Sequence, residues 1–321
     1  MAVAYPDSAP ARDQWILSRR PARHEVDASR PYAVVTEQER DATGEVVSVL
    51  TVFLTNRECP WRCLMCDLWK NTLDSRVPDG AIPAQIDYAL ERLPPARHIK
   101  LYNSGSFFDA GAIPRKDYPA IAQRLRGFER VIVECHPSLV GPATLEFQEL
   151  LSGQLEVAMG LETANPEVLA RLNKRMTREQ FAAASAFLRQ HEIDLRVFIL
   201  IKPPFLNETE ALHWAAESVR FAFDCGASVV SLIPTRAGNG AMEALMEEGL
   251  FSPPTLSLIE QATRGALAMK RGRTLVDLWD LKQFAECEHC FEKRRAALER
   301  MNLTQVIEPS VECAHCASAS F

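Results

Sequence analysis

Short apolar runs alternate with helical stretches along most of this chain, and this alternation constrains its fold more than any other feature. Six runs have the near-continuous hydrophobic pattern of buried strands. They lie at residues 46–55, 99–103, 130–135, 155–161, 195–201 and 228–233. Stretches with helical spacing lie at roughly 82–93, 116–126, 142–152, 166–190 and 207–224. Buried strands separated by helices predict a parallel sheet that is covered by helices.

The number of strands predicts an α/β fold with a partial barrel. Six strands are too few to close an eight-stranded TIM barrel, so we expect a partial (βα)6 TIM-like barrel over residues 41–250. Residues 1–40 are rich in Pro, Ala and Arg and predict an N-terminal arm, whereas residues 251–321 predict a helix followed by a cysteine-rich C-terminal extension. Ligands of such barrels bind at the carboxyl ends of the strands. The residues that follow each strand are therefore the candidate site residues.

Composition and charge exclude several classes of protein. With 321 residues, 47% of them hydrophobic, the chain is long enough to bury a barrel core. Its net charge of −6 does not favour polyanion binding, and the basic cluster of Arg19, Arg20 and Arg23 predicts a solvated surface. No apolar run reaches the roughly 18 residues of a membrane span, and the first residues lack the layout of a signal peptide. Free thiols with ligand-like spacing then predict a cytoplasmic protein without a membrane partner.

Three cysteines follow the first predicted strand in the spacing CxxxCxxC: Cys59, Cys63 and Cys66. Cysteine thiolates are the ligands of iron–sulfur clusters, and two short gaps allow one loop to surround a single 4Fe–4S cluster. Because no fourth cysteine lies nearby, the fourth iron stays open, as in metal sites that perform chemistry. A zinc site would need a second cysteine pair, and a disulfide framework would need an oxidising compartment. The spacing therefore favours a cluster.

A cluster loop of this kind after a strand resembles that of the radical S-adenosylmethionine (SAM) enzymes. The run LEVAMGLETANPEVLARLNKR at 155–175 closely resembles the elongator and oxygen-independent coproporphyrinogen oxidase branch of this superfamily. The stretches Asn-Ser-Gly-Ser-Phe at 103–107 and Lys-Pro-Pro-Phe at 202–205 resemble the archaeosine-synthase radical SAM subfamily, which acts on a modified tRNA base. Radical SAM proteins have a partial (βα)6 barrel, in agreement with the strand count.

The resemblance implies a set of SAM-binding positions at the strand ends. They are Ser104, Gly105, Ser106, Glu134, Glu162 and Lys174. The Ser-Gly-Ser stretch replaces the Gly-Gly-Glu that is usual in the family, and an ordinary turn is its alternative. A cation such as Lys174 suits the SAM carboxylate, and Glu162 can accept a hydrogen bond from the amino group or the ribose. Arg175 is an adjacent candidate, and a cation at a helix end is the alternative for Lys174.

Two further strand ends carry a charge that could face a substrate. Lys202 is the only charge in the run Phe198–Lys202 that ends the apolar fifth strand, and Arg236 follows the sixth, where the barrel rim is its alternative. Both are candidate substrate contacts, and no catalytic residue is assigned. Cys135 and Cys225 are expected in the core, and His136 is expected to cap a turn or lie on the surface.

Four cysteines of the extension form two CxxC pairs, Cys287 with Cys290 and Cys313 with Cys316, separated by 22 residues. Paired CxxC motifs indicate a metal site, and about 15–20 residues separate the pairs in related zinc sites. Four thiolates hold either zinc or an auxiliary 4Fe–4S cluster, and the sequence leaves both open. Zinc would fasten the tail to the barrel, whereas an auxiliary cluster would lie near the substrate as an electron relay or sulfur source.

The resemblance implies a radical SAM enzyme, without deciding between an oxidoreductase, a lyase and a transferase. SAM would be cleaved reductively at the cluster, with a low-potential donor such as flavodoxin or ferredoxin, and a 5′-deoxyadenosyl radical would abstract hydrogen from a substrate C–H bond. The subfamily favours a modified nucleobase, as in tRNA, while the acidic balance favours a small-molecule intermediate. A non-catalytic iron–sulfur or zinc protein is the alternative of another class, but it has no need of Glu162 and Lys174.

Overall fold

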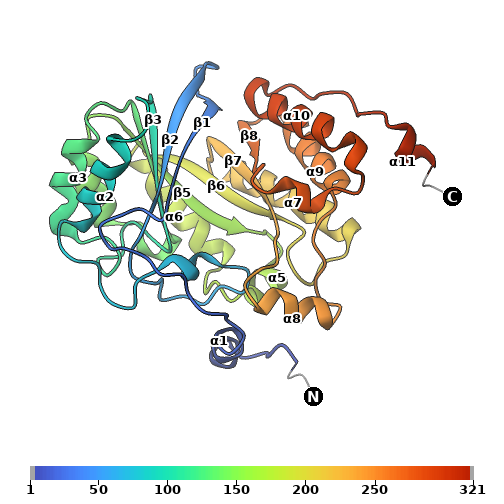
Figure 1. Cartoon of the computed structure of the whole chain (residues 1–321), viewed down its shortest axis with the longest axis horizontal. Helices are drawn as coiled ribbons and strands as arrows, with labels where there is room; N and C mark the ends of the chain where they lie inside the picture. The colour runs from blue at the N-terminus through green and yellow to red at the C-terminus, as the bar shows by residue number, and fades with distance from the viewer. Residues whose placement is uncertain (1–3, 319–321) are drawn as a thin grey trace.

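The computed structural model describes residues 4–318 and contains one eight-stranded sheet, which curls into an open barrel (Figure 1). Its strands follow one another in space as in sequence: β1 (Ala33–Arg40), β2 (Val46–Leu54), β3 (His98–Asn103), β4 (Arg130–Glu134), β5 (Gln154–Glu162), β6 (Asp194–Ile201), β7 (Val229–Pro234) and β8 (Arg273–Val276). β1 pairs antiparallel with β2, and each later strand pairs parallel with the one before it. The first three residues of the predicted arm and the last three of the predicted extension lie outside the described residues.

Helices surround the sheet, with α2 and α3 on one side of it and α9 and α10 on the other (Figure 1). The described helices are α1 (Ala9–Leu17), α2 (Ala81–Leu90), α3 (Tyr118–Arg124), α4 (Pro142–Leu150), α5 (Pro166–Arg171), α6 (Arg178–Gln190), α7 (Glu208–Asp224), α8 (Ala241–Glu247), α9 (Leu256–Ala268), α10 (Glu288–Thr304) and α11 (Ala314–Ser318). Thr177 and Asn207 start α6 and α7, because each side chain accepts a hydrogen bond from the backbone three residues later. Within residues 4–318, no helix is long and apolar enough to cross a membrane.

The predicted partial barrel with its cysteine-rich extension is confirmed, and the six predicted strands are β2 to β7. Two strands of the sheet, β1 and β8, were not predicted. β8 has only four residues, too few for a recognisable hydrophobic run. β1, inside the region taken as an arm, has the polar sequence AVVTEQER, with an exposed middle at residues 36–38 and a buried Glu39. An antiparallel edge strand with one solvated face lacks the continuous apolar pattern of a buried parallel strand.

Charged side chains from several strands meet inside the barrel, and they explain why β1 is polar. The fully buried Arg196 of β6 donates hydrogen bonds to Glu156 of β5 at 2.6 Å and to Glu39 of β1 at 3.0 Å. The Lys100 ammonium of β3 lies 2.7 Å from the Glu39 carboxylate. Burial alone would raise the pKa of Glu39, but Arg196 and Lys100 outweigh it and hold that pKa well below its usual value. Because buried charges need partners, β1 is held in the sheet by these ion pairs.

Candidate functional site

The three cysteines of the CxxxCxxC motif lie in the loop that leaves the carboxyl end of β2. All three are free thiols and half-buried, and burial raises the pKa of each to about 12. The loop, called the cluster loop below and covering residues 55–67, is fixed on both sides. Its Leu64 donates a backbone hydrogen bond to Leu172 at 2.9 Å and packs with apolar side chains of α1 and α8. The loop is therefore seated at the mouth of the barrel.

A carboxylate next to the first cysteine ties the N-terminal arm to the cluster loop. Glu58 forms ion pairs with Arg20 at 2.7 Å, with Arg62 at 3.1 Å and with Arg23. Arg20 also lies over the ring of Trp69, 4.5 Å from its centroid, and its side chain is only 9% exposed. The expectation of a solvated basic surface at Arg20 is thus wrong, because the arm folds over the loop and buries this guanidinium against a partner charge.

The end of β5 brings Glu162 and Lys174 together, as the resemblance implied. The Lys174 ammonium donates a hydrogen bond to the Glu162 carboxylate, and both residues are buried. Glu162 has a φ of 67° next to an irregularity in the strand register. A Cβ added at Gly160 would lie 2.1 Å from the Glu162 carboxylate and 2.3 Å from the Lys174 ammonium. A side chain at position 160 would therefore force the ends of Glu162 and Lys174 to move from this arrangement.

Lys174 also acts electrostatically on two cysteines of the cluster loop. Although burial lowers its pKa, Glu162 and then Cys63 raise it, and the net shift is upward, so the side chain is an ammonium ion. In turn its positive charge favours the thiolate forms of Cys59 and Cys63. It therefore partly offsets the rise in their pKa that burial causes. Thiolates are the forms that bind metal. The ion pair and the cysteines therefore belong to one electrostatic site.

The Ser-Gly-Ser stretch after β3 lies directly against the first cysteine. Gly105 has a φ of 125°, and a Cβ added to it would lie 3.0 Å from the Cβ and 3.3 Å from the Sγ of Cys59. Asn56 of the cluster loop and Ser104 exchange two hydrogen bonds, each 3.3 Å long. The hydroxyl of Ser106 instead donates to Cys135, which lies in the core as predicted. Of the three residues, Gly105 makes the close approach.

Glu134 and Asn103 supply polar groups that are buried without enough partners. Burial raises the pKa of Glu134 to about 8, although the backbone N–H of Asn103, which donates to its carboxylate at 3.1 Å, and Lys174 both lower it. The Asn103 side chain is buried, and neither its oxygen nor its nitrogen has a hydrogen-bond partner among the described residues. A buried amide left unpaired costs about 1–3 kcal/mol. Asn103, which the sequence did not single out, therefore fits a polar ligand between β3 and the cluster loop.

Glu134→Gln is expected to remove a pH dependence of stability. In the folded protein the Glu134 pKa is about 8, against 4.5 for an ordinary glutamate, so the native state keeps a proton that the unfolded chain releases. Stability from this group is therefore complete below pH 4.5 and falls as the pH rises towards 8. Urea unfolding at pH 5 and pH 8, without SAM, should show a smaller decline for the variant than for the wild type. Equal declines would contradict the raised pKa.

His136 belongs to the site, although the sequence favoured a capping or surface role. Its ring stacks on Trp61 of the cluster loop, with centroids 3.9 Å apart and planes within 10°. Its Nδ1 accepts a hydrogen bond from Ser138, as in the predicted cap, so the neutral ring carries its proton on Nε2 and donates to the Lys174 carbonyl at 3.1 Å. Burial lowers its pKa to about 4. His136 thus connects the cluster loop with the segment that carries Lys174.

The two candidate substrate contacts are already paired within the protein. Lys202, just after β6, has a φ of 55°, donates to Ser252 at 2.9 Å and lies 3.6 Å from Glu208. Arg236, after β7, forms an ion pair with Asp277 at 2.9 Å. A role of either side chain in binding substrate stays a prediction.

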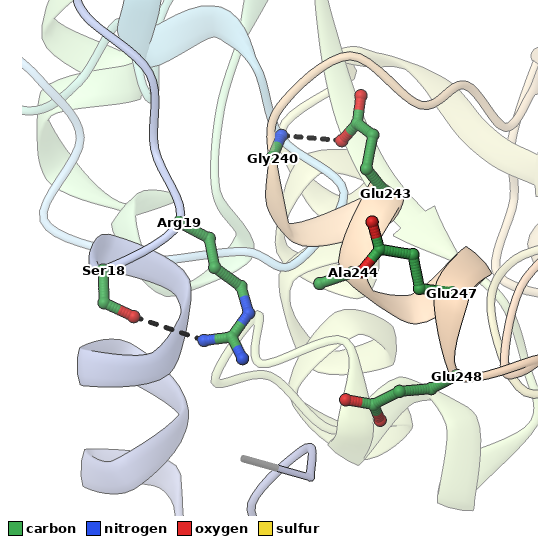
Figure 2. Close-up of a pocket in the computed structure, with 7 residues that line it drawn as sticks. All are labelled: Ser18, Arg19, Gly240, Glu243, Ala244, Glu247 and Glu248. Carbon is green, nitrogen blue, oxygen red and sulfur yellow. Dashed lines mark hydrogen bonds between the residues drawn. The ribbon is translucent and has the colours of Figure 1, made fainter. Parts of the chain in front are cut away.

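Two surface cavities are lined by residues other than the predicted cofactor and metal ligands. One, of about 490 Å³, separates the end of α1 from α8, where Arg19 points into the space beside Glu247 and Glu248 (Figure 2). Glu243 at its edge accepts from the Gly240 backbone at 2.7 Å and so starts α8. The other, of about 330 Å³, lies between α6 and the 3₁₀ turn Pro137–Leu139. Neither is lined by a predicted cofactor or metal residue, so the strand ends remain the candidate site.

Comparisons with known proteins show what this chain is similar to in sequence. No protein-family model matches the chain. It is 26% identical over 311 residues to an uncharacterized protein of Methanocaldococcus jannaschii, a match that covers 89% of this chain and 85% of that protein. It is also 26% identical over 238 residues to an archaeosine synthase subunit beta of Methanosarcina acetivorans, covering 70% of this chain and 68% of that protein.

Solved structures of radical SAM enzymes share the fold. An archaeal Elp3 from Methanocaldococcus infernus, with an N-terminal deletion, aligns with a TM-score of 0.52 at 14% sequence identity, covering 68% of this chain and 59% of that one. At this identity the match concerns the fold alone. The resemblance to radical SAM enzymes that the sequence indicated is thus confirmed: the chain has the fold of these enzymes, and its sequence is similar to that of archaeosine synthase subunit beta.

Proposed function

We propose that this protein is a radical SAM enzyme that acts on a modified nucleobase of tRNA. The observation that carries the proposal is the meeting of three groups at one end of the barrel. The free thiols of the cluster loop follow β2, Gly105, which approaches Cys59 closely, follows β3, and the buried pair of Glu162 and Lys174 lies at the end of β5. When bound, a 4Fe–4S cluster supplies the electron that cleaves SAM to methionine and a 5′-deoxyadenosyl radical, which abstracts hydrogen from a substrate C–H bond.

The residues present fit both cofactors. Cys59, Cys63 and Cys66 would hold three irons of the cluster, and no fourth cysteine belongs to the cluster loop. Lys174 supplies the cation that a SAM carboxylate requires. The unpaired Asn103 amide offers its NH2 group as a donor and its oxygen as an acceptor in the same region. The chain's own contribution is to hold these groups in place, to keep Lys174 protonated and to exclude water from a buried site.

The substrate class rests on sequence similarity. The chain matches archaeosine synthase subunit beta from two archaea, Methanosarcina acetivorans and Thermococcus kodakarensis, at 26% and 28% identity. Archaeosine synthase acts on a base of tRNA, so a nucleobase within tRNA is the substrate we propose here. A low-potential protein such as flavodoxin or ferredoxin is the electron donor that this chemistry calls for.

The experiment that tests the proposal compares substrates under anaerobic conditions. The protein is reconstituted with iron and sulfide, and 5′-deoxyadenosine is measured after addition of SAM and dithionite. Tubes contain unfractionated tRNA with its modified bases, the free nucleosides from digested tRNA, or no substrate. We expect tRNA to increase 5′-deoxyadenosine several-fold over the substrate-free tube, and the nucleosides to have little effect. Equal yields in all three tubes would contradict the tRNA substrate but not SAM cleavage.

A further inference from the structure

The two CxxC pairs of the extension come together in the folded protein. Cys287 precedes α10 and Cys290 lies in its first turn, while Cys313 and Cys316 frame the start of α11. The four sulfur atoms all lie within 4.8 Å of one another. Two of these separations are 4.0 Å, between Cys287 and Cys313, and 3.7 Å, between Cys290 and Cys316. Segments 22 residues apart in sequence therefore bring their thiols to one point.

The spacing of the sulfur atoms distinguishes between zinc, a 4Fe–4S cluster and a disulfide. A tetrahedral zinc ion with Zn–S bonds of about 2.3 Å places its sulfurs about 3.8 Å apart. The two S···S separations given above, 3.7 and 4.0 Å, agree with this spacing. A 4Fe–4S cluster carries each thiolate on a different iron and directed outward, so its four sulfurs spread farther apart than around a single ion. A disulfide needs an S–S length of about 2.05 Å, far shorter than either of these separations.

We propose that Cys287, Cys290, Cys313 and Cys316 bind one zinc ion in a closed, tetrahedral site with a structural role. Four thiolates complete the coordination of zinc and leave no open position for chemistry. Two histidines inside the motifs, His289 and His315, stack on each other with centroids 3.8 Å apart. The group of ligand atoms that lie within 4.8 Å of one another consists of the four cysteine sulfurs, so the cysteines alone are assigned as ligands. The inference concerns the extension and does not depend on the proposed function.

The position of the site also argues against an electron relay. The cluster loop packs against side chains of α1 and α8, which lie at the lower side of Figure 1, whereas α11 lies at the right-hand margin beyond α9 and α10 (Figure 1). An auxiliary cluster would serve the reaction only near the substrate. A metal at the margin of the molecule instead connects the tail to the helix that starts at Cys287.

The helix that this metal would anchor covers the open edge of the sheet. Asn302 of α10 exchanges two hydrogen bonds, each of 2.8 Å, with the backbone of Val276 on β8. Gln305, which ends α10, does the same with Thr274 at 2.7 and 2.9 Å. These amides satisfy edge groups that another strand would otherwise pair with. The zinc site fastens the first turn of α10, and these amides fasten its other end.

The test is the metal content of purified protein after dialysis against chelator. In the variant in which Cys59, Cys63 and Cys66 are alanine, we expect one zinc and no iron per chain. Cys313→Ala/Cys316→Ala should lose the zinc yet, after reconstitution, still bind about four irons in the cluster loop. The matched control His289→Ala/His315→Ala should keep its zinc.

Three outcomes of the same measurement would overturn the assignment: about four irons, a single iron, or no metal in the variant that lacks the cluster-loop cysteines. Because that variant keeps the extension intact, the assignment does not rest on the folding of a protein with an altered tail. Cobalt(II) supplied in place of zinc gives a second readout, since a tetrahedral thiolate site produces intense visible absorption. Absorption typical of octahedral cobalt would contradict the closed site.

Discussion

The variant in which Cys59, Cys63 and Cys66 are all replaced by alanine is expected to form no detectable 5′-deoxyadenosine from SAM. It should also contain about four fewer irons per chain than the wild type after reconstitution, since the three thiolates hold one 4Fe–4S cluster. The measurement is iron content together with chromatographic detection of 5′-deoxyadenosine. No other group within the cluster loop offers a thiolate, so we expect the loss to be complete.

Cys225→Ala is the matched control for this variant. Cys225 follows α7, is partly buried and packs against the core, as predicted from the sequence. Its removal should leave iron content and SAM cleavage unchanged. If the triple variant instead kept its iron and its activity, the cluster would have to lie elsewhere in the chain.

Lys174→Met is expected to have the second largest effect, on both stability and SAM binding. It leaves the Glu162 carboxylate buried beside the thiols without its partner. Removing one partner of a buried ion pair lowers the free energy of unfolding by about 3–5 kcal/mol. It also removes the cation proposed for the SAM carboxylate. Urea unfolding should show the loss of stability, and equilibrium dialysis with labelled SAM should show weaker binding.

A double variant separates the structural role of the ion pair from its role in binding. In Lys174→Met/Glu162→Gln no charge is left unpaired, so most of the lost stability should return while SAM binding stays weak. Arg220→Met is the matched control, because its ion pair with Glu217 on α7 has both side chains more than a third accessible and such pairs contribute about 0–1 kcal/mol. Recovery of SAM binding in the double variant would show that the pair is only structural.

The parts of the fold that could be predicted from the sequence are the strands whose apolar residues follow one another directly along the chain. β2 to β7 are continuous apolar runs, and their ends hold the residues that the resemblance assigned to SAM. β1 escaped prediction because its buried residue, Glu39, is charged. Its carboxylate is paired there by Arg196 and Lys100, which come from strands far away in the sequence. No pattern within residues 33–40 reports those partners.

The same limit applies to the site. Spacing alone identified the cluster-loop cysteines, and motif resemblance identified Glu162 and Lys174. The ion pairs of Arg20 and Arg23 with Glu58 join residues more than thirty positions apart. The stacking of Trp61 on His136 joins loops that follow two different strands. Such contacts exist only once the barrel has formed. An asparagine directly before the Ser-Gly-Ser turn was the one available signal for Asn103.

The measurement that tests the central claim most directly is the yield of 5′-deoxyadenosine from the wild-type protein with a loaded cluster. Reconstituted anaerobically to about four irons per chain, and given SAM and dithionite, the protein is predicted to produce 5′-deoxyadenosine together with methionine, and none when dithionite is omitted. The absence of 5′-deoxyadenosine from a protein shown to carry the full cluster would contradict the assignment as a radical SAM enzyme.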